Sequence, residues 1–308
     1  MPILVPPALA ESLAEFLGAD GRTWAARLPA LAGELLERWE LRPDGPVAHG
    51  VVGLVLPVRR ADGTPAALKL QPVDEETAGE PVALRAWDGH GAVRLLDHES
   101  GSGSMLLERL DPARSLLELP DDREALHVLA GLLGELTQHQ APIGLRTLAE
   151  TADRLLLRAP AAAAALGDPA ERRLLADCTA ALLAVCAEPG DRLLHWDLHY
   201  GNVLAPPPGS DRAPWLAIDP KPLAGHPGFE LLPALRNRWA DVSAAGDPAR
   251  ALRWRFELLV EVLELDREVA AAWTLARVLQ NAVWAVEEGE GAFDPAQRVI
   301  AELLLGRS

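Results

Sequence analysis

Hydrophobic residues form mostly short apolar runs between residues 47 and 110 and follow helical spacing on both sides of that region. Between residues 47 and 110, short apolar runs bounded by turn residues predict strands at 47–60, 66–71, 92–98 and 105–110. Residues 74–88 predict a single helix within this series. The pattern therefore predicts a small antiparallel sheet with one helix.

Helical spacing prevails on both sides of that sheet. Residues 8–40 predict two amphipathic helices, and the second is expected to begin near Pro29 because proline suits a first helical turn. Beyond residue 110 the predicted helices cover 122–139, 145–158, 169–187, 229–239, 247–265, 267–288 and 294–305. The predicted fold class is α+β with two lobes: a small β-rich N-terminal lobe (1–110) and a larger, mainly helical C-terminal lobe (111–308).

Composition narrows the classes of partner. The formal charge of −16 argues against nucleic-acid binding, which needs a basic surface, and it suits a cationic substrate. The only two cysteines, Cys178 and Cys186, lie about 12 Å apart along one predicted helix, too far for a disulfide. The chain shows no signal peptide and no apolar span of membrane length. A cytoplasmic monomer without membrane or nucleic-acid partners is expected.

Residues 195–204 concentrate the polar chemistry of the chain. They read His-Trp-Asp-Leu-His-Tyr-Gly-Asn-Val-Leu, and the apolar run 215–218 leads into Asp219. Two short strands joined by the Pro/Gly-rich turn 206–209 would bring Asp219 back beside Asn202. This set suits phosphoryl transfer, with Asp197 as the base that orients an acceptor hydroxyl and with Asn202 and Asp219 as oxygen ligands of Mg²⁺.

Two other interpretations of this segment stay open. Asn202 and Asp219 could simply complete turns, which these residue types do well. His195, Asp197 and His199 share one face of an extended segment and could bind zinc, although a fourth ligand is missing.

An upstream lysine adds to the phosphoryl-transfer interpretation. Lys69 lies between apolar residues of a predicted strand, where an unpaired ammonium would be costly, and Glu80 follows on the predicted helix. The pair is a candidate for holding nucleotide phosphates; the alternative is a snorkelling lysine and a solvated glutamate. No Gly-rich loop ending in Lys-Ser or Lys-Thr occurs, which excludes a P-loop enzyme.

Several stretches together resemble the aminoglycoside phosphotransferases, in the branch that contains streptomycin 6-kinases and hydroxyurea phosphotransferases. The resemblance is carried by residues 56–65 before Lys69, and by 83–87, 92–96, 106–112, 195–204 and 215–222. It implies a protein-kinase-like fold and ATP-dependent phosphorylation of a hydroxyl on a small molecule. It also implies that a hinge from Glu108 to Leu110 binds adenine through backbone groups. The other site residues that it implies are Lys69 and Glu80 for the nucleotide phosphates, Asp197 as the base, and Asn202 and Asp219 for Mg²⁺.

The chain departs from the family pattern at residues near this motif. Trp196 stands where related kinases often have glycine, and Tyr200 where they have a small residue or proline. Both aromatic residues could line a substrate pocket or pack beneath the loop. Glu230 stands where an aspartate commonly braces the catalytic loop. Lys221 could contact phosphate or substrate, or could be a surface lysine.

The resemblance implies the 6-hydroxyl of streptomycin as the acceptor, and an acidic cleft would attract the guanidinium groups of that molecule. Hydroxyurea, an amino sugar or another metabolite would be phosphorylated by the same catalysis. A kinase-shaped protein that holds nucleotide without turnover is a further alternative. It would need a lesion among Lys69, Asp197, Asn202 and Asp219, and all four residues are intact.

Overall fold

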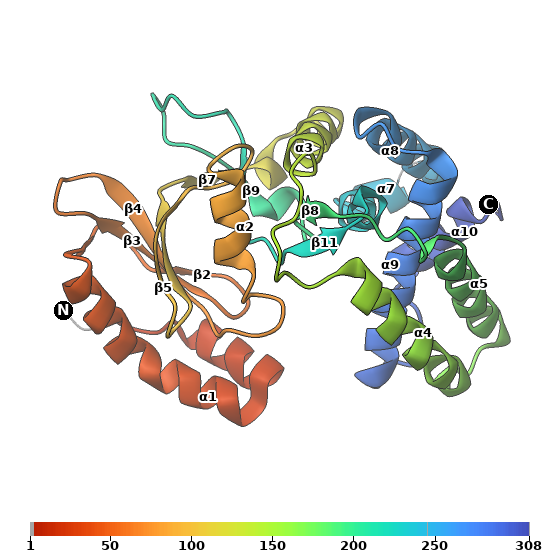
Figure 1. Cartoon of the computed structure of the whole chain (residues 1–308), viewed down its shortest axis with the longest axis horizontal. Coiled ribbons are helices and arrows are strands. Elements are labelled where there is room, and N and C mark those ends of the chain that lie inside the picture. Colours follow the sequence, from red (N-terminus) through yellow and green to blue (C-terminus); the bar gives the residue numbers. More distant parts are fainter. Residues whose placement is uncertain (1–2, 245, 308) are drawn as a thin grey trace. The chain divides into compact units, whose positions relative to one another are not determined.

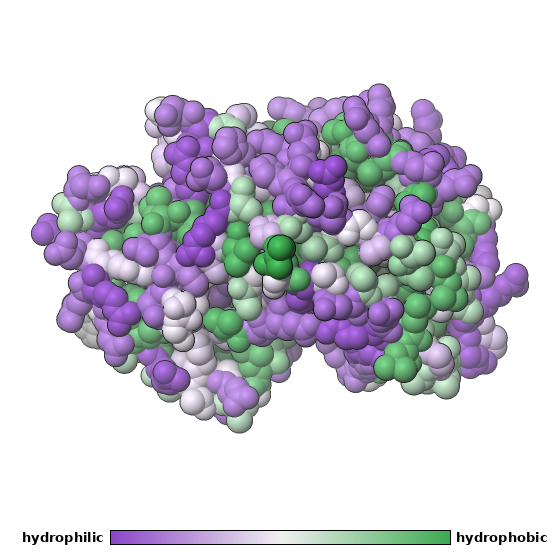
Figure 2. Space-filling model, viewed as in Figure 1, coloured by the Kyte–Doolittle hydropathy of each residue, from purple (hydrophilic) through white to green (hydrophobic). Residues whose placement is uncertain are grey.

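The computed structural model describes residues 3–244 and 246–307 (Figure 1). The chain divides into two compact units, Met1–Ala113 with Ala205–Leu216 and Arg114–Leu204 with Ala217–Ser308. The face in Figure 2 is largely hydrophilic, with hydrophobic residues in scattered patches. Within the described ranges, no helix combines the length and apolarity that crossing a membrane requires.

The first unit is built on an antiparallel sheet. Its strand order is β1-β3-β4-β6-β5, and β2 pairs with β3. The strands are β1 (Arg42–Pro43), β2 (Ala48–His49), β3 (Leu54–Arg59), β4 (Pro65–Leu70), β5 (Leu95–Glu99) and β6 (Ser104–Glu108). β3 and β4 are in register from Leu54 opposite Leu70 to Arg59 opposite Pro65. The predicted sheet is therefore present, although its third long strand begins at Leu95 rather than at residue 92.

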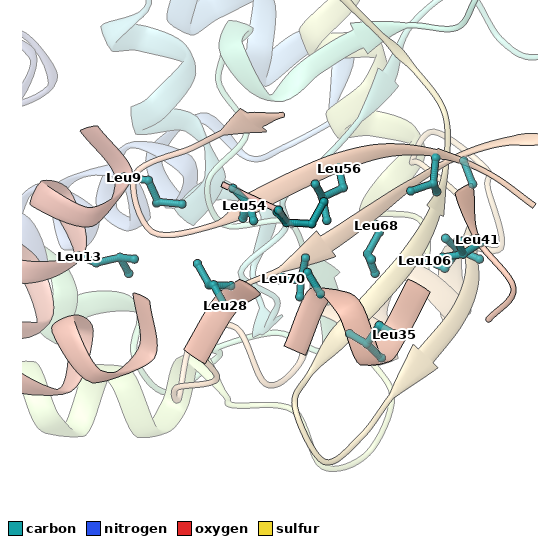
Figure 3. Packing of buried hydrophobic residues seen from close by; sticks show 14 residues of the cluster. Leu9, Leu13, Leu28, Leu35, Leu41, Leu54, Leu56, Leu68, Leu70 and Leu106 are labelled. Carbon is teal, nitrogen blue, oxygen red and sulfur yellow. The ribbon is translucent and has the colours of Figure 1, made fainter. Parts of the chain in front are cut away.

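Helix α1 (Pro7–Arg38) covers one face of this sheet. Figure 3 shows its leucines, among them Leu9, Leu28 and Leu35, meeting leucines of the strands such as Leu54 and Leu68. Fully burying one such side chain contributes about 1.5–3 kcal/mol, so this apolar contact is a main source of the unit's stability.

The prediction of two helices in this region was right in number but wrong about the break. The helix kinks at Gly18, whose φ is 58°, and Pro29 lies inside the second segment. Glycine takes the left-handed conformation without a Cβ penalty. The chain also needs glycine at position 21, where a Cβ would lie 1.9 Å from the carbonyl oxygen of Leu13.

Helix α2 (Glu80–Trp87) is shorter than predicted. The segment before it is held in turns, because the Asp74 carboxylate accepts hydrogen bonds from the amides of Glu76 and Thr77 at 2.8 Å. Pro81 therefore lies in the first turn, where a missing N–H costs nothing, and does not kink the helix. Glu80 stands at the first position of the helix.

The second unit is mainly helical, as predicted. Its helices are α3 (Asp122–Leu136), α4 (Leu148–Ala165), α5 (Pro169–Val185), α6 (Leu231–Arg236), α7 (Trp239–Ala244), α8 (Pro248–Val262), α9 (Arg267–Glu287) and α10 (Pro295–Leu304). α9 packs against α4, α5 and α10 and carries the fully buried Trp273. Side chains cap several of these helices; Asp168, for example, accepts from the amide of Ala170 at the start of α5. Cys178 and Cys186 are both free thiols.

Short strands and 3₁₀ turns surround the polar motif. β8 (Arg192–Leu194) pairs antiparallel with β11 (Leu223–Gly225). β9 (Val203–Ala205) lies between β10 (Leu216–Ala217) and β7 (Asp111–Ser115). The 3₁₀ segments are η1 (Leu116–Glu118), η2 (Tyr200–Asn202) and η3 (Pro227–Glu230). The motif thus occupies the loop between β8 and β9, with its first and last residues tied to strands.

Candidate active site

The candidate catalytic loop, residues 195–202, is fixed at its start by a buried histidine. The His195 ring is fully buried, and its Nε2 donates to the carbonyl of Ile218 at 2.9 Å. Its Nδ1 accepts from the amide of Asp197 at 3.4 Å. Burial lowers the pKa of His195 to about 4, so the ring is neutral at physiological pH. His195 therefore supports the loop.

Asp197 presents its carboxylate beside a lysine. Asp197 Oδ2 lies 3.1 Å from Lys221 Nζ, and the two side chains are 27% and 33% exposed. The carbonyl of Asp197 accepts from Asn202 Nδ2 at 2.9 Å. The loop therefore leaves the carboxylate accessible to a ligand while its backbone is held from within.

The predicted hairpin return is present. The amide of Ile218 donates to the carbonyl of Asn202 at 2.9 Å, which brings the residue before Asp219 against Asn202. Asp219 has a φ of 57°, a left-handed conformation that Asp adopts more readily than most residues. Because Asn202 uses Nδ2 within the loop, its Oδ1 is the atom suited to a metal.

Asn202 and Asp219 could hold Mg²⁺, which favours a few oxygen ligands from the protein and takes the rest from water and phosphate; that they do so stays a prediction. The zinc alternative has no support. The Nδ1 atoms of His195 and His199 accept backbone N–H groups at 3.4 and 3.0 Å. Across residues 3–244 and 246–307, no group of three His, Cys, Asp or Glu side chains could hold a metal ion.

Trp196 packs beneath the loop. It is 2% exposed and has a φ of 68°, and its amide donates to Glu230 Oε1 at 2.7 Å. The guanidinium carbons of Arg146 and Arg277 lie over its indole ring, 4.4 and 4.3 Å from the ring centroid. The edge of Trp284 meets it at a centroid distance of 5.9 Å. The suggestion that Trp196 lines a substrate pocket is wrong; the ring anchors the residue before Asp197.

Glu230 does brace this loop. Its carboxylate is fully buried, and burial raises its pKa to about 7, although the Trp196 amide and the charge of Arg277 favour the ionised form.

Tyr200 anchors the other end of the loop. Its ring is fully buried, its amide donates to Asn237 Oδ1 at 3.1 Å, and its hydroxyl donates to Asp122 Oδ1 at 3.1 Å. Arg255 pairs with the same Asp122 carboxylate at 2.7 Å. Burial raises the pKa of the Tyr200 phenol, which keeps it a hydrogen-bond donor. Tyr200 therefore also belongs to the packing under the loop.

In the first unit, Lys69 and Glu80 make the expected contact. Lys69 Nζ lies 2.7 Å from both Glu80 oxygens, and Gln71 Nε2 donates to Glu80 Oε2 at 2.6 Å. The side chains of Lys69 and Glu80 are 9% and 0% exposed, so the pair is not a solvated surface contact. The lysine is thereby held in one direction; that it points at nucleotide phosphates stays a prediction.

Glu108 is held by an arginine that the sequence analysis did not single out. Arg212, on the loop between β9 and β10, donates to the Glu108 carboxylate from Nε and Nη2 at 3.0 and 2.9 Å. Its Nη2 also reaches the carbonyls of Gly89 and Ala92 at 2.7 and 3.1 Å. Leu110 is buried. Adenine binding by the backbone from Glu108 to Leu110 stays a prediction.

The sequence analysis did not single out Arg146 and Arg277 either, although the position of Arg277 in the sequence could have pointed to it. It stands between Ala276 and Val278 in a predicted helix rich in apolar residues, where a buried charge would be costly unless something compensated for it.

An ion-paired lysine in a β-sheet unit, followed by an Asp, Asn and Asp set on a loop and its return strand, defines a phosphotransferase of the protein-kinase-like class. The chain belongs to the aminoglycoside/hydroxyurea antibiotic resistance kinase family, whose pattern matches residues 38–289.

Two relatives match this chain over nearly its whole length. It is 55% identical over 302 residues to a streptomycin 6-kinase of Streptomyces glaucescens, covering 98% of this chain and 97% of that protein. It is 57% identical over 306 residues to a hydroxyurea phosphotransferase of Kitasatospora aureofaciens, covering 99% and 86%.

A solved choline/ethanolamine kinase family protein from Mesorhizobium loti superimposes with a TM-score of 0.57 over 90% of this chain and 93% of that one, at 15% identity, and so shares the fold. The predicted family, kinase-like fold and phosphotransferase activity are confirmed.

Proposed function

We propose that this kinase transfers the γ-phosphoryl group of ATP to the 6-hydroxyl of streptomycin and so confers resistance to it. The observation that carries the proposal is the Asp197 carboxylate, held open to a ligand on a loop whose backbone is fixed at both ends. The choice of acceptor is supported by the 55% identity to a streptomycin 6-kinase. The acidic chain suits this cationic acceptor.

In this mechanism Asp197 accepts a hydrogen bond from the acceptor hydroxyl and takes its proton as the new O–P bond forms. The bond between the γ-phosphorus and the oxygen that bridges to the β-phosphate breaks, and that oxygen leaves with ADP. Mg²⁺, held by Asn202 and Asp219, would neutralise charge on the phosphates. Lys69, positioned by Glu80, would contact the phosphates, and the backbone from Glu108 to Leu110 would bind adenine. We further propose that the enzyme is a cytoplasmic monomer.

A second acceptor has its own support. The 57% identity to a hydroxyurea phosphotransferase favours hydroxyurea, which the same base could activate. Both acceptors need the same loop, so the loop does not discriminate between them.

The test is an assay of ATP consumption with Mg²⁺ against streptomycin, hydroxyurea, amino sugars and other aminoglycosides, with mass spectrometry of the product. We expect a phosphorylated product from streptomycin that Asp197→Asn does not form. Turnover with hydroxyurea alone would establish the second acceptor, and turnover only with amino sugars would overturn the resistance function. Turnover with none of them would overturn the assignment of this acceptor class.

A further inference from the structure

Lysine is rare in this chain, and both lysines lie in the candidate sites. Of the 29 lysine and arginine residues, only Lys69 and Lys221 are lysines. Each pairs with a carboxylate of the proposed machinery: Lys69 with Glu80 at 2.7 Å and Lys221 with Asp197 at 3.1 Å. Arginine supplies the cation in the exposed ion pairs, such as that of Arg267 with Glu257. A surface charge at position 221 would therefore be expected to be arginine as well.

The two cations differ in what they can contact. Arginine presents a planar fork, whereas lysine presents a compact ammonium with three donors that can be shared between neighbouring oxygens. A lysine ammonium can therefore stay hydrogen-bonded to a carboxylate oxygen while its remaining N–H groups bind a phosphoryl oxygen.

The backbone of Lys221 is fixed to the catalytic loop. Its amide donates to the carbonyl of His195 at 3.0 Å, and its carbonyl accepts from Arg146 Nη2 at 3.3 Å. The same Arg146 guanidinium lies on the Trp196 ring. The side chain of Lys221 is one-third exposed, so its ammonium is accessible to a ligand while the backbone from which it extends is fixed.

We propose that Lys221 is a catalytic residue that binds the γ-phosphoryl group while it passes to the acceptor. The proposal rests on the proposed function, with Asp197 as the base. An acceptor hydroxyl bonded to Asp197 lies about 3 Å from its carboxylate, and the γ-phosphorus lies in line beyond that hydroxyl. An ammonium 3.1 Å from the same carboxylate is therefore within reach of an equatorial phosphoryl oxygen.

Each change in bonding and charge during the phosphoryl transfer can then be assigned to a group. The acceptor oxygen bonds to phosphorus, the bond to the β-phosphate oxygen breaks, and the acceptor proton moves to Asp197. Charge spread over the equatorial oxygens is met by the Lys221 ammonium, which stays protonated. A fixed donor directed at developing charge stabilises the transition state more than the ground state.

A chain with two lysines allows a direct test that does not depend on the acceptor. An amine-acylating reagent can modify the one-third exposed Lys221, whereas Lys69 is buried against Glu80, and peptide mass spectrometry separates the two sites. With Mg²⁺, we expect a non-hydrolysable ATP analogue to protect Lys221 and ADP to leave it reactive. Equal protection of Lys221 by ADP and the analogue, or by neither, would overturn the role of Lys221. Absence of ADP and analogue binding in a calorimetric titration would instead overturn the nucleotide site of the proposed function.

Kinetics of Lys221→Met and Lys221→Arg provide a second test. We expect Lys221→Met to lower kcat about 100-fold with little change in KM for ATP, as for loss of one transition-state donor. Lys221→Arg should recover part of this loss. Slow hydrolysis of ATP without acceptor should fall in parallel, so the comparison holds whichever acceptor is correct.

The matched control is Arg267→Met, which removes a cation from an exposed ion pair and should leave kcat unchanged. A raised KM for the acceptor with an unchanged kcat in Lys221→Met would make Lys221 a substrate-binding residue and overturn the proposal. If Lys221→Met does not fold, Lys221→Arg and the labelling experiment still decide the question.

Discussion

The amide of Trp196 donates to the buried Glu230 carboxylate at 2.7 Å, and through this bond a residue 34 positions away holds the backbone immediately before Asp197. The Trp196 backbone is left-handed, with φ of 68°, which costs a non-glycine residue about 1–2 kcal/mol. Trp196 gains a hydrogen bond to Glu230 and contacts of its ring with the guanidinium groups of Arg146 and Arg277.

Two substitutions of Glu230 distinguish the effect of its hydrogen bond from the effect of its charge. Glu230→Gln keeps an acceptor for the Trp196 amide and should retain most activity. Glu230→Ala leaves that amide unpaired and buried, and should lower the free energy of unfolding by about 1–3 kcal/mol and reduce kcat. Urea unfolding and steady-state rates would measure both effects, and equal behaviour of the two variants would contradict the role of the hydrogen bond.

Stability should depend on pH through the same residue. The pKa of Glu230 rises from 4.5 to about 7 on folding, so the folded state binds the extra proton and loses stability as pH rises across that range. His195 acts in the opposite direction, because its pKa falls from 6.5 to about 4 and its contribution is lost as pH falls. The stability of Glu230→Gln relative to wild type should therefore rise between pH 4.5 and 7. Urea unfolding across this range measures the difference, and a flat difference would contradict the buried carboxylate.

Trp196→Gly tests packing against backbone strain. Glycine relieves the left-handed φ, a gain of about 1–2 kcal/mol, but deletes a buried indole, a loss of about 3–5 kcal/mol. We expect a lower Tm and a lower kcat. A variant with unchanged Tm but an altered KM for the acceptor would instead place Trp196 in a substrate pocket.

Asp197→Asn should abolish transfer and leave nucleotide binding nearly intact. The amide preserves the shape of the side chain but cannot take the acceptor proton, and loss of a general base costs about 100- to 10,000-fold. Calorimetric titration with ADP and the rate of product formation give the two readouts. Near-normal turnover would show that another group is the base.

Asp219→Ala should weaken Mg²⁺-nucleotide binding as well as rate, because it removes a proposed metal ligand. The loss in ADP affinity should be seen with Mg²⁺ and disappear in its absence. Asn202→Ala should act in the same direction but also remove the bond from Asn202 Nδ2 to the carbonyl of Asp197. If Asp219→Ala lost the same affinity with and without Mg²⁺, the residue would act through the fold.

The sequence by itself predicted the residues of the polar motif and the order of strands and helices. Asp197, Asn202 and Asp219 lie within one loop and one hairpin, and periodicity alone distinguished the sheet from the helices. Such features depend on neighbours in the chain, which a sequence displays directly.

Contacts between distant segments required the folded chain. Whether Trp196 and Tyr200 face ligand or core depends on Arg277 and Asp122, which lie 81 and 78 residues away in the sequence. The break in α1 falls at Gly18 rather than near Pro29, and residues on both sides of the break, such as Leu13 and Leu28, belong to the same core cluster as the sheet leucines. Residue types and their spacing in the sequence identify the side chains that can react. The orientation of each side chain is fixed by burial and by pairing with distant residues, because burial and pairing depend on which surfaces the whole folded chain brings together.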